Sequence, residues 1–196
     1  MGNKLQNAVG HFRTITKHKF TVMGLCFRIG LIRQGLLHDN SKYTPVEFRT
    51  GVRYYQGNKS PNAVEKREKG YSDAWLHHKG RNKHHFEYWL DLSYQPGEGV
   101  VGAKMPLKYV LEMACDRIAA CKIYHGSSYT DRDPWEYYSA KNSCVHVCLH
   151  KDTRAMLEKI LQMLAEEGEE KTIRYMRWLI RNPQIYEDGS ISSGRA

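Results

Sequence analysis

A long helical repeat near the N-terminus constrains the fold more than any other feature of the sequence. Apolar side chains and two histidines follow one another in steps of four and three residues: His11, Ile15, His18, Val22, Leu25, Ile29 and Ile32. This spacing places them on one face of an α-helix, which we predict to end near Gln34 and Gly35. His18 shares the apolar face, so we expect its imidazole to point into the core.

Helix-start signals recur along the rest of the chain. Thr44 to Glu47 and Asp133 to Glu136 each combine an N-cap residue, a proline at the first helical position and the glutamate of a capping box. No strand pattern is visible. We predict one all-α domain over residues 1–186 and a disordered polar tail over residues 187–196, with an additional C-terminal helix pair. The expected helices cover residues 45–56, a short piece after Ser60, 73–91, 106–124, 152–167 and 169–181.

Composition limits the class of protein. The chain has 196 residues, 41% hydrophobic and 26% charged, which suits a single soluble domain. Apolar runs are as short as Val22 to Phe27, so we expect no membrane span and no signal peptide. Five cysteines, an odd number, favour reduced thiols in the cytoplasm. The net charge of +9 favours partners that carry phosphate, from nucleotides to nucleic acid, and also fits a merely basic soluble protein.

A His-Asp pair follows the first predicted helix. Gly35-Leu-Leu-His38-Asp39-Asn-Ser-Lys42 sets an imidazole beside a carboxylate, with a lysine three residues later. Zn²⁺, Mn²⁺ and Fe²⁺ accept this mixture of nitrogen and oxygen ligands. A nearby lysine can neutralise an anion held on the metal.

Two further histidine pairs lie seven residues apart, His77-His78 and His84-His85. On one continuous helix the pairs superimpose after two turns, with His78 and His85 on the stripe of Trp75 and Trp89. We therefore predict His78 and His85 as metal ligands and rank His77 and His84 second. Gly80 could break the helix, and a solvated histidine face is the alternative interpretation.

Asp116 lies within an apolar helical segment. It shares a stripe with Tyr109, Met113, Ala120 and Ile123. A carboxylate on such a stripe must be paired, hydrogen-bonded or metal-bound, because a buried isolated charge is very costly. Taken without the histidines, a salt bridge with Arg117 or with a lysine elsewhere is the better explanation.

The order His18, His38-Asp39, Asp116 resembles the ligand order of the HD (His-Asp) superfamily of metal-dependent phosphohydrolases. The extra histidines before Asp116 are similar to those of members that hold two metals. Asn40 and Ser41 depart from the usual residues after the pair, and His11 is an alternative first ligand. The spacing His-Asp-x-Ser-Lys and His-His-x-x-x-Asn-x-His-His also resembles an uncharacterised bacterial and phage family without known activity.

The resemblance implies an HD-like helical fold and one or two divalent ions of Mn, Fe, Zn or Ni, bound by His18, His38, Asp39, His78, His85 and Asp116. It implies hydrolysis of a phosphorylated small molecule such as a nucleotide by metal-activated water. Lys42, with Arg81 or Arg117, would offset phosphoryl charge, and Glu87 would carry a proton. A di-iron oxygenase and a non-enzymatic basic binding module, related to phage or nucleic acid, are the alternatives.

Other chemistry-bearing residues fit less specific sites. Cys144, His146, Cys148 and His150 alternate with apolar residues and could hold a separate zinc ion. Their spacing matches no common zinc module, so buried cysteines near a helix start are the favoured interpretation. Tyr54, Tyr55, Tyr71, Tyr137 and Tyr138 could stack on a base or simply pack at the core margin.

Overall fold

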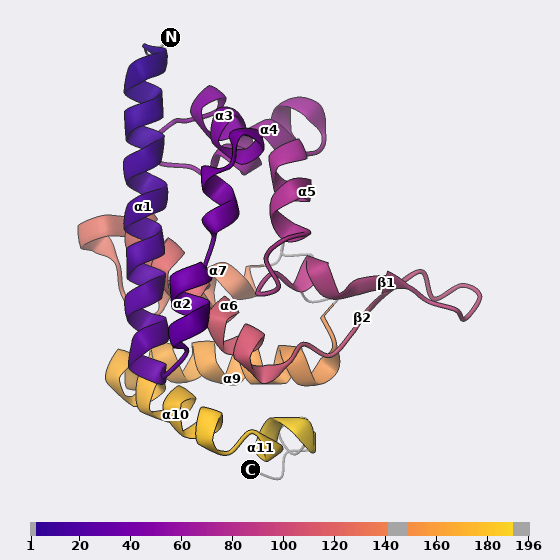
Figure 1. The fold of residues 1–196 in the computed structure, drawn as a ribbon. Coiled ribbons are helices and arrows are strands. Elements are labelled where there is room, and N and C mark those ends of the chain that lie inside the picture. The colour runs from indigo at the N-terminus through magenta and orange to yellow at the C-terminus, as the bar shows by residue number, and fades with distance from the viewer. Residues whose placement is uncertain (1–2, 141–148, 190–196) are drawn as a thin grey trace.

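Helix α1 (Lys4–Ile29) runs down one side of the molecule, with most of the other helices to one side of it and α9 and α10 crossing beneath its C-terminal end (Figure 1). The computed structural model describes residues 3–140 and 149–189. The prediction of a mainly α-helical domain is confirmed. After α1 the helices are α2 (Ile32–Leu37), η1 (Asn40–Tyr43), α3 (Pro45–Arg53), α4 (Pro61–Lys69), α5 (Asp73–Lys79), η2 (Phe86–Trp89), α6 (Leu107–His125), η3 (Gly126–Ser128), α7 (Asp133–Ser139), α9 (Lys151–Glu167), α10 (Glu169–Arg181) and α11 (Gln184–Glu187).

The first helix ends earlier than the sequence repeat predicted. Gly30 adopts a left-handed φ of 94°, and its N–H donates to the carbonyls of Cys26 and Phe27. A residue without Cβ accepts this conformation at little cost and closes a helix there. Ile32 therefore belongs to a separate helix, α2, which packs back against α1. This reversal brings His38 and Asp39 alongside the middle of α1.

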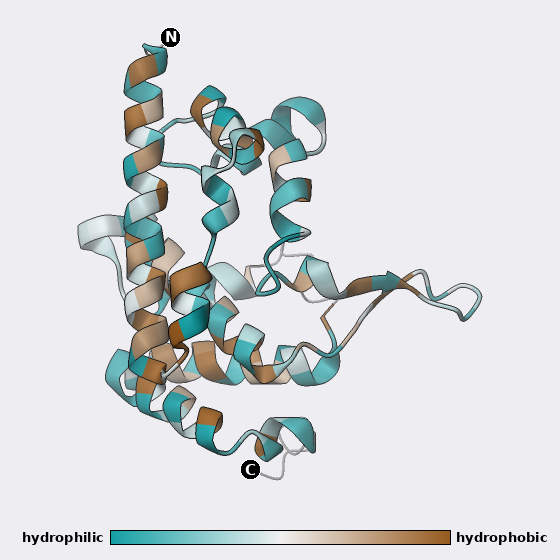
Figure 2. Ribbon diagram, in the orientation of Figure 1, coloured by the Kyte–Doolittle hydropathy of each residue, from teal (hydrophilic) through white to brown (hydrophobic). Residues whose placement is uncertain are grey.

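The apolar core occupies one half of the molecule. It is built from the inner faces of α1, α6, α9 and α10, and α9 and α10 are the predicted C-terminal helix pair. Figure 2 shows hydrophobic residues gathered there, while α3, α4 and α5 are largely hydrophilic. Buried side chains such as Leu111, Ile118, Leu161 and Met176 remove apolar area from water, which stabilises the fold. The polar half, built on this rigid base, carries the candidate site.

Three local predictions were wrong. The helix expected over residues 73–91 ends at Lys79. Residues Leu90–Leu92 (β1) and Val100–Gly102 (β2) pair as a small antiparallel hairpin where no strand was predicted. Glu187 belongs to α11, so it does not begin a tail, and residues 190–196 lie outside the described part of the chain. No helix of the described residues is both long and apolar enough to cross a bilayer.

Close packing of α3 on α1 gives a test of the fold. A Cβ added at Gly51 would lie 2.0 Å from Nε2 of His11, which is buried between the two helices. Gly51→Ala should therefore destabilise the protein by roughly 1–3 kcal/mol in urea unfolding. Gly24→Ala is the matched control, because a Cβ there meets nothing within 4 Å. It should stabilise α1 by about 0.5–1 kcal/mol, and equal effects of the two changes would contradict this packing.

Candidate metal centre

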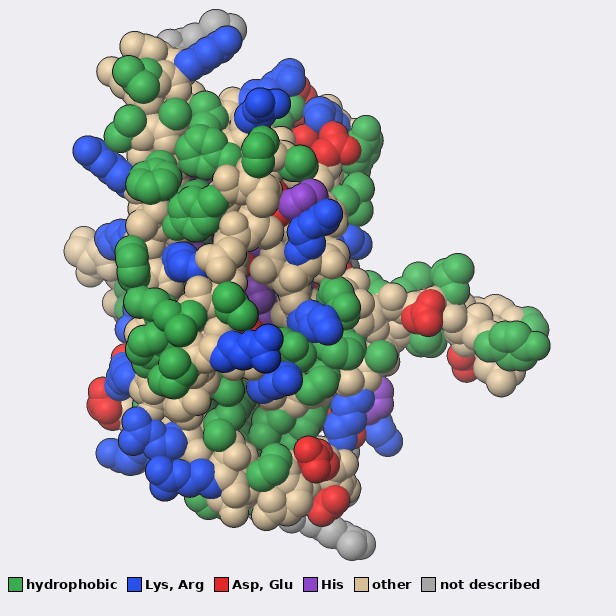
Figure 3. Space-filling model, viewed as in Figure 1, with side chains coloured by type: hydrophobic (Ala, Val, Ile, Leu, Met, Phe, Trp, Pro, Cys, Tyr) green, Lys and Arg blue, Asp and Glu red, His purple; other side chains and the backbone are tan. Residues whose placement is uncertain are grey.

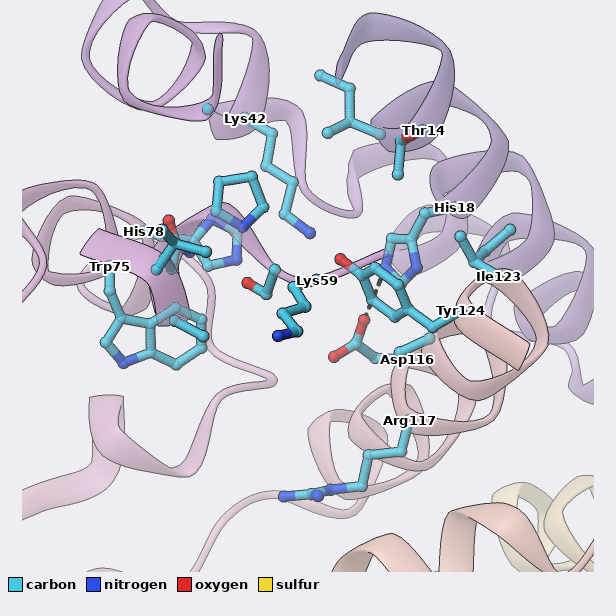
Figure 4. A pocket seen from close by; sticks show the side chains of 18 of the residues that line it. Thr14, His18, Lys42, Lys59, Trp75, His78, Asp116, Arg117, Ile123 and Tyr124 are labelled. Atoms are coloured by element: carbon cyan, nitrogen blue, oxygen red, sulfur yellow. Dashed lines mark hydrogen bonds and ion pairs between the residues drawn. The ribbon is translucent and has the colours of Figure 1, made fainter. Parts of the chain in front are cut away.

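Helix α1 supplies the first candidate ligand and α6 supplies the last. His18 is buried on the inner face of α1, where the repeat predicted it. Its Nε2 lies 2.9 Å from Oδ1 of Asp116, which projects from α6 (Figure 4). These two residues are 98 positions apart in the chain, so the contact depends on the packing of α1 against α6.

Asp39 lies at the middle of the centre in a strained conformation. Its φ of 53° is the one positive value among the non-glycine residues that the structure describes. Left-handed backbone at an aspartate is tolerated better than at most residues but still costs energy, on the order of 1–3 kcal/mol. The conformation links α2 to η1 and turns a fully buried carboxylate inward.

The two oxygens of Asp39 face two different sets of histidines. Oδ2 lies 3.6 Å from Nε2 of His18 and 3.3 Å from Nε2 of His38. Oδ1 lies 3.2 Å from Nε2 of His78 and 3.4 Å from Nε2 of His84. A carboxylate that meets ligands on both sides is suited to bridge two metal ions.

These separations are those of atoms that share a metal ion. Ligands held at 2.0–2.2 Å from one ion lie about 2.9–3.5 Å from each other. His38 Nε2, His84 Nε2 and Asp39 Oδ1 are buried and have no hydrogen-bond partner among the described residues. Buried polar atoms without partners are rare in folded proteins and call for an explanation. Divalent cations bound on the two sides of Asp39 would satisfy these atoms, so the donor set fits the predicted metal.

Two groups of side chains therefore form candidate positions for metal ions, and Asp39 belongs to both groups. The first position consists of His18, His38, Asp39 and Asp116. The second consists of Asp39, His78, His84 and His85. Within each group the ligand atoms lie within 4.8 Å of one another.

Glu112 orients one histidine of each position. Nδ1 of His38 lies 2.9 Å and Nδ1 of His84 lies 3.2 Å from its Oε1. Both imidazoles donate Nδ1–H to this carboxylate, which leaves Nε2 of each ring turned toward Asp39. His38, His84 and Glu112 also form a compact group of their own. Because the atoms without partners are the Nε2 nitrogens, we interpret Glu112 as an orienting residue and not as a ligand.

Glu47 has the same role for the second position. Its Oε2 lies 2.7 Å from Nδ1 of His78, and its Oε1 lies 2.6 Å from Nδ1 of His77. His78 Nε2 then faces His85 Nε2 at 2.8 Å. Without metal, a proton on one of the two nitrogens makes this a hydrogen bond. With metal, both nitrogens could instead bind one shared ion.

Burial and charge set the protonation of the centre. Burial alone would lower the pKa of His38, but Asp39 beside it, with Asp116 and Glu112, raises that pKa well above 6.5. Burial would raise the pKa of Asp39, but His38, Lys42 and His78 hold it well below 3.8. Burial, together with the charges of His84 and His78, lowers the pKa of His85 well below 6.5. Without metal, the raised pKa of His38 favours an imidazolium there, whereas the lowered pKa of His85 keeps that ring neutral.

This protonation predicts how metal affinity depends on pH. The pKa of His38 is raised in the metal-free protein, so a metal must displace a proton from it at neutral pH. The apparent affinity for Zn²⁺ should rise between pH 6 and 8, by about tenfold per pH unit for each proton displaced. Titration calorimetry in buffers of different ionisation enthalpy measures that proton release. A flat profile without proton release would contradict this protonation.

The structure brings some predicted residues to the centre and leaves others away from it. Lys42 places Nζ 2.5 Å from Oδ2 of Asp39. His84, ranked second, lies nearly as close to Asp39 as His78 does, at 3.4 Å against 3.2 Å. His77 contacts Glu47 and does not reach Asp39. Arg81 is exposed on the turn after α5 and donates to the carbonyl of His77, away from the centre.

The break after α5 explains why the sequence pattern placed His84 behind His85. The chain leaves the helix at Gly80 and turns tightly through residues 80–85. Neighbouring side chains on a helix point about 100° apart, but in this turn His84 and His85 both reach the second position. His11, the alternative first ligand, lies beside Phe48 and Tyr55 and belongs to neither position.

The two orienting glutamates were missed as functional residues. Glu47 was predicted to close a capping box, but Thr44 makes no side-chain cap hydrogen bond and Glu47 contacts histidines instead. Glu112 lies four residues before Asp116, on the same side of α6. That spacing is the signal that could have found it.

A cavity of about 880 Å³ opens beside the centre. Figure 4 shows the two sides of this cavity and the lysines that reach between them: His18, Asp116 and Tyr124 on one side, His78 and Trp75 on the other, with Lys42 and Lys59 between. Arg117 and Glu87 also line it. Among the predicted tyrosines, Tyr55 and Tyr137 do so as well.

The second proposed cluster falls largely outside the described residues. Cys144, His146 and Cys148 belong to residues 141–148, and the structure does not describe that segment. His150 is described, and its side chain caps α9 by accepting from the N–H of Asp152. The zinc site predicted there stays a prediction.

Comparison with known proteins identifies a family without an assigned activity. No curated protein and no solved structure matched the chain. One family model, described as a family of unknown function (DUF5662), matches residues 7–163, a range that includes every candidate ligand. No HD-domain family matched, so that resemblance depends on the ligand order alone. The chain belongs to the DUF5662 family, whose function is unknown.

Proposed function

We propose that this protein is a dinuclear metal-dependent phosphohydrolase that acts on a nucleotide or another small phosphate ester. The observation that carries the proposal is the carboxylate of Asp39, whose oxygens face two ligand groups beside a cavity lined by cationic side chains. Two ions about 3.5–4 Å apart are a recurrent arrangement in phosphatases and nucleases.

The ligand sets suggest the metals. His18, His38, Asp39 and Asp116 would hold one ion, and Asp39, His78, His84 and His85 the other. Imidazole with carboxylate suits Mn, Fe, Zn or Ni. When bound, such ions lower the pKa of water to roughly 7 and polarise a phosphoryl oxygen.

The basic side chains of the cavity would bind the phosphate. Lys42 already pairs with Asp39, so much of its charge is compensated within the centre. Arg117 is the better candidate to bind substrate, because it lines the cavity and forms no ion pair with an acidic side chain among the described residues. Planar guanidinium groups bind phosphate oxygens in pairs. Glu87 lines the same cavity and could accept a proton.

The outer wall of the cavity favours a substrate larger than inorganic phosphate. Tyr55, Tyr124 and Tyr137 supply aromatic rings. Lys59, Lys66 and Arg67 add positive charge. Rings that can stack on a base, combined with cations, fit a nucleotide better than a neutral sugar or a peptide.

The test is phosphate release from a panel of phosphate esters by protein reconstituted with each metal. We expect activity with Mn²⁺ or Zn²⁺ that is lost with a chelator and in His38→Ala and Asp116→Ala. The absence of release from every ester, with both ions bound, would contradict the proposal. Salt-sensitive nucleic-acid binding that survives chelation and His38→Ala would instead favour the basic binding module.

Arg117→Met gives a sharper prediction for the same assay. Loss of a charged hydrogen bond to the phosphate should raise KM by about 10- to 100-fold. The metal content should stay unchanged, because Arg117 belongs to neither ligand group. Arg81→Met is the matched control, since Arg81 is exposed and does not line the cavity. Equal kinetics of the two variants would remove Arg117 from the substrate site.

A di-iron oxygenase is the second candidate. The observation that favours it is the nitrogen-rich second position, in which three histidines accompany one shared carboxylate. Imidazole suits iron as well as zinc. An absorbance of the iron-loaded protein that changes with oxygen, without phosphate release under any metal, would favour this reading.

A further inference from the structure

Helix α1 has a second apolar face that Tyr43 and α2 cover only in part. Its members, here called the α1 ridge, are Leu5, Val9, Phe12, Phe20 and Phe27, which are 69%, 42%, 49%, 58% and 37% exposed. At 100° per residue they lie within about 80° of one another and roughly opposite the buried face that holds His18. Figure 3 shows hydrophobic side chains running down this side of the molecule.

Helix α2 extends the apolar surface. Ile32, Leu36 and Leu37 are 49%, 53% and 56% exposed, and α2 packs directly on α1. Surface helices normally show one apolar stripe with polar residues opposite it. A helix with apolar residues on both faces, one of them open to water, indicates a surface that binds something.

The charged side chains of α1 itself are all basic, and among them Arg28 is paired with Glu169 and Glu170 of α10. Residues 1–38 contain no aspartate or glutamate. Arg13 and Lys17 follow the ridge on one flank and Lys19 on the other, according to their helical angles. Neither Arg13 nor Lys17 forms an ion pair within the part of the chain that the structure describes. The partner must therefore be apolar at its centre and negative at its margins.

This charge pattern distinguishes between the possible binding partners of the ridge. A second copy would set its own basic α1 against this one and bring only like charges together. The exposed ridge side chains are Phe, Leu and Val, which offer no hydrogen-bonding group to a protein partner. Aromatic and aliphatic side chains with lysine and arginine at the edges are typical of helices that lie in a membrane interface.

We propose that the α1 ridge binds the surface of an anionic lipid bilayer, with α1 lying flat on it. No described helix is suited to span a bilayer, so the contact is confined to the surface. His18 projects from the opposite face of α1, so binding would leave the metal centre free. The inference is independent of the proposed hydrolase activity.

Co-sedimentation of the metal-loaded protein with vesicles tests the proposal. The vesicles contain either phosphatidylcholine alone or equal parts of phosphatidylcholine and phosphatidylglycerol. We expect binding to the anionic vesicles that weakens as salt rises. Leu5→Ser with Phe20→Ser, and separately Arg13→Gln with Lys17→Gln, should each reduce the partition coefficient by about tenfold or more. Leu92→Ser with Tyr94→Ser is the control, because both residues are highly exposed in the distant hairpin.

The possible results distinguish a lipid bilayer from the other binding partners that the ridge could have. Unchanged metal content in every variant shows that the centre is still folded. Equal binding to both kinds of vesicle, or equal loss in the hairpin control, overturns the proposal. A wild type that light scattering shows to be a dimer, and that the ridge variant converts to a monomer, assigns the ridge to a second copy. A monomer that binds neither vesicle also overturns it and leaves an acidic protein as the partner.

Discussion

Replacing Asp39 by asparagine should remove both metal ions at once. The carboxylate belongs to both ligand groups and lies among four histidines and Lys42. Asparagine keeps the size of the side chain and tolerates the left-handed φ of 53°. Metal content should fall from about two ions per chain to nearly none, and any hydrolase activity by on the order of a thousandfold or more.

Asp91→Asn is the control for the loss of one negative charge. Asp91 is exposed in β1 and does not line the cavity. Elemental analysis after dialysis, with circular dichroism to confirm folding, measures the effect. If Asp39→Asn keeps one full equivalent of metal at wild-type affinity, Asp39 does not bridge two positions.

Replacing Glu112 by glutamine should weaken both metal positions without removing a ligand. Glu112 accepts Nδ1–H from His38 of the first position and from His84 of the second. Both imidazoles meet the same oxygen, Oε1, so glutamine keeps an acceptor for them. Its neutral amide oxygen accepts more weakly than a carboxylate and no longer raises the basicity of the two rings. Loss of such an orienting partner typically lowers metal affinity by about 10- to 100-fold.

Glu47→Gln is the matched comparison, because Glu47 contacts His78 of the second position but no ligand of the first. Competition with a coloured chelator resolves the two binding steps. Both steps should weaken in Glu112→Gln and only one in Glu47→Gln. If Glu112→Gln loses one ion completely and leaves the other untouched, Glu112 is itself a ligand.

Much of the helical fold could be predicted, because the signals that form and start a helix act within a few residues. The repeat around His18 and Val22 predicted α1, and Thr44-Pro45 predicted the start of α3, since periodicity and prolines act within one turn. The end of α1 was misplaced because a favourable apolar position at Ile32 continued the pattern past Gly30. The β1–β2 hairpin was missed because its strands are three residues long and largely exposed.

The sequence predicted most of the residues of the candidate centre, but it did not predict how they are arranged in space. His18, His38-Asp39 and Asp116 were found because their chemistry is unusual where it occurs. The place of His84 depends on the turn after Gly80, and a helical projection cannot represent that turn. Glu47 and Glu112 acquire their roles only when α3 and α6 meet the histidines. Contacts of this kind lie far apart in sequence and leave no local pattern.

The central claim is that Asp39 holds two metal ions next to each other. Electron paramagnetic resonance of the protein loaded with two equivalents of Mn²⁺ tests it most directly, because ions that share a carboxylate couple magnetically. We predict the broad multiline spectrum of a coupled pair, replaced in Asp39→Asn by the spectrum of free Mn²⁺. A six-line spectrum from a single isolated ion in the wild type, or the absence of binding, would contradict the account.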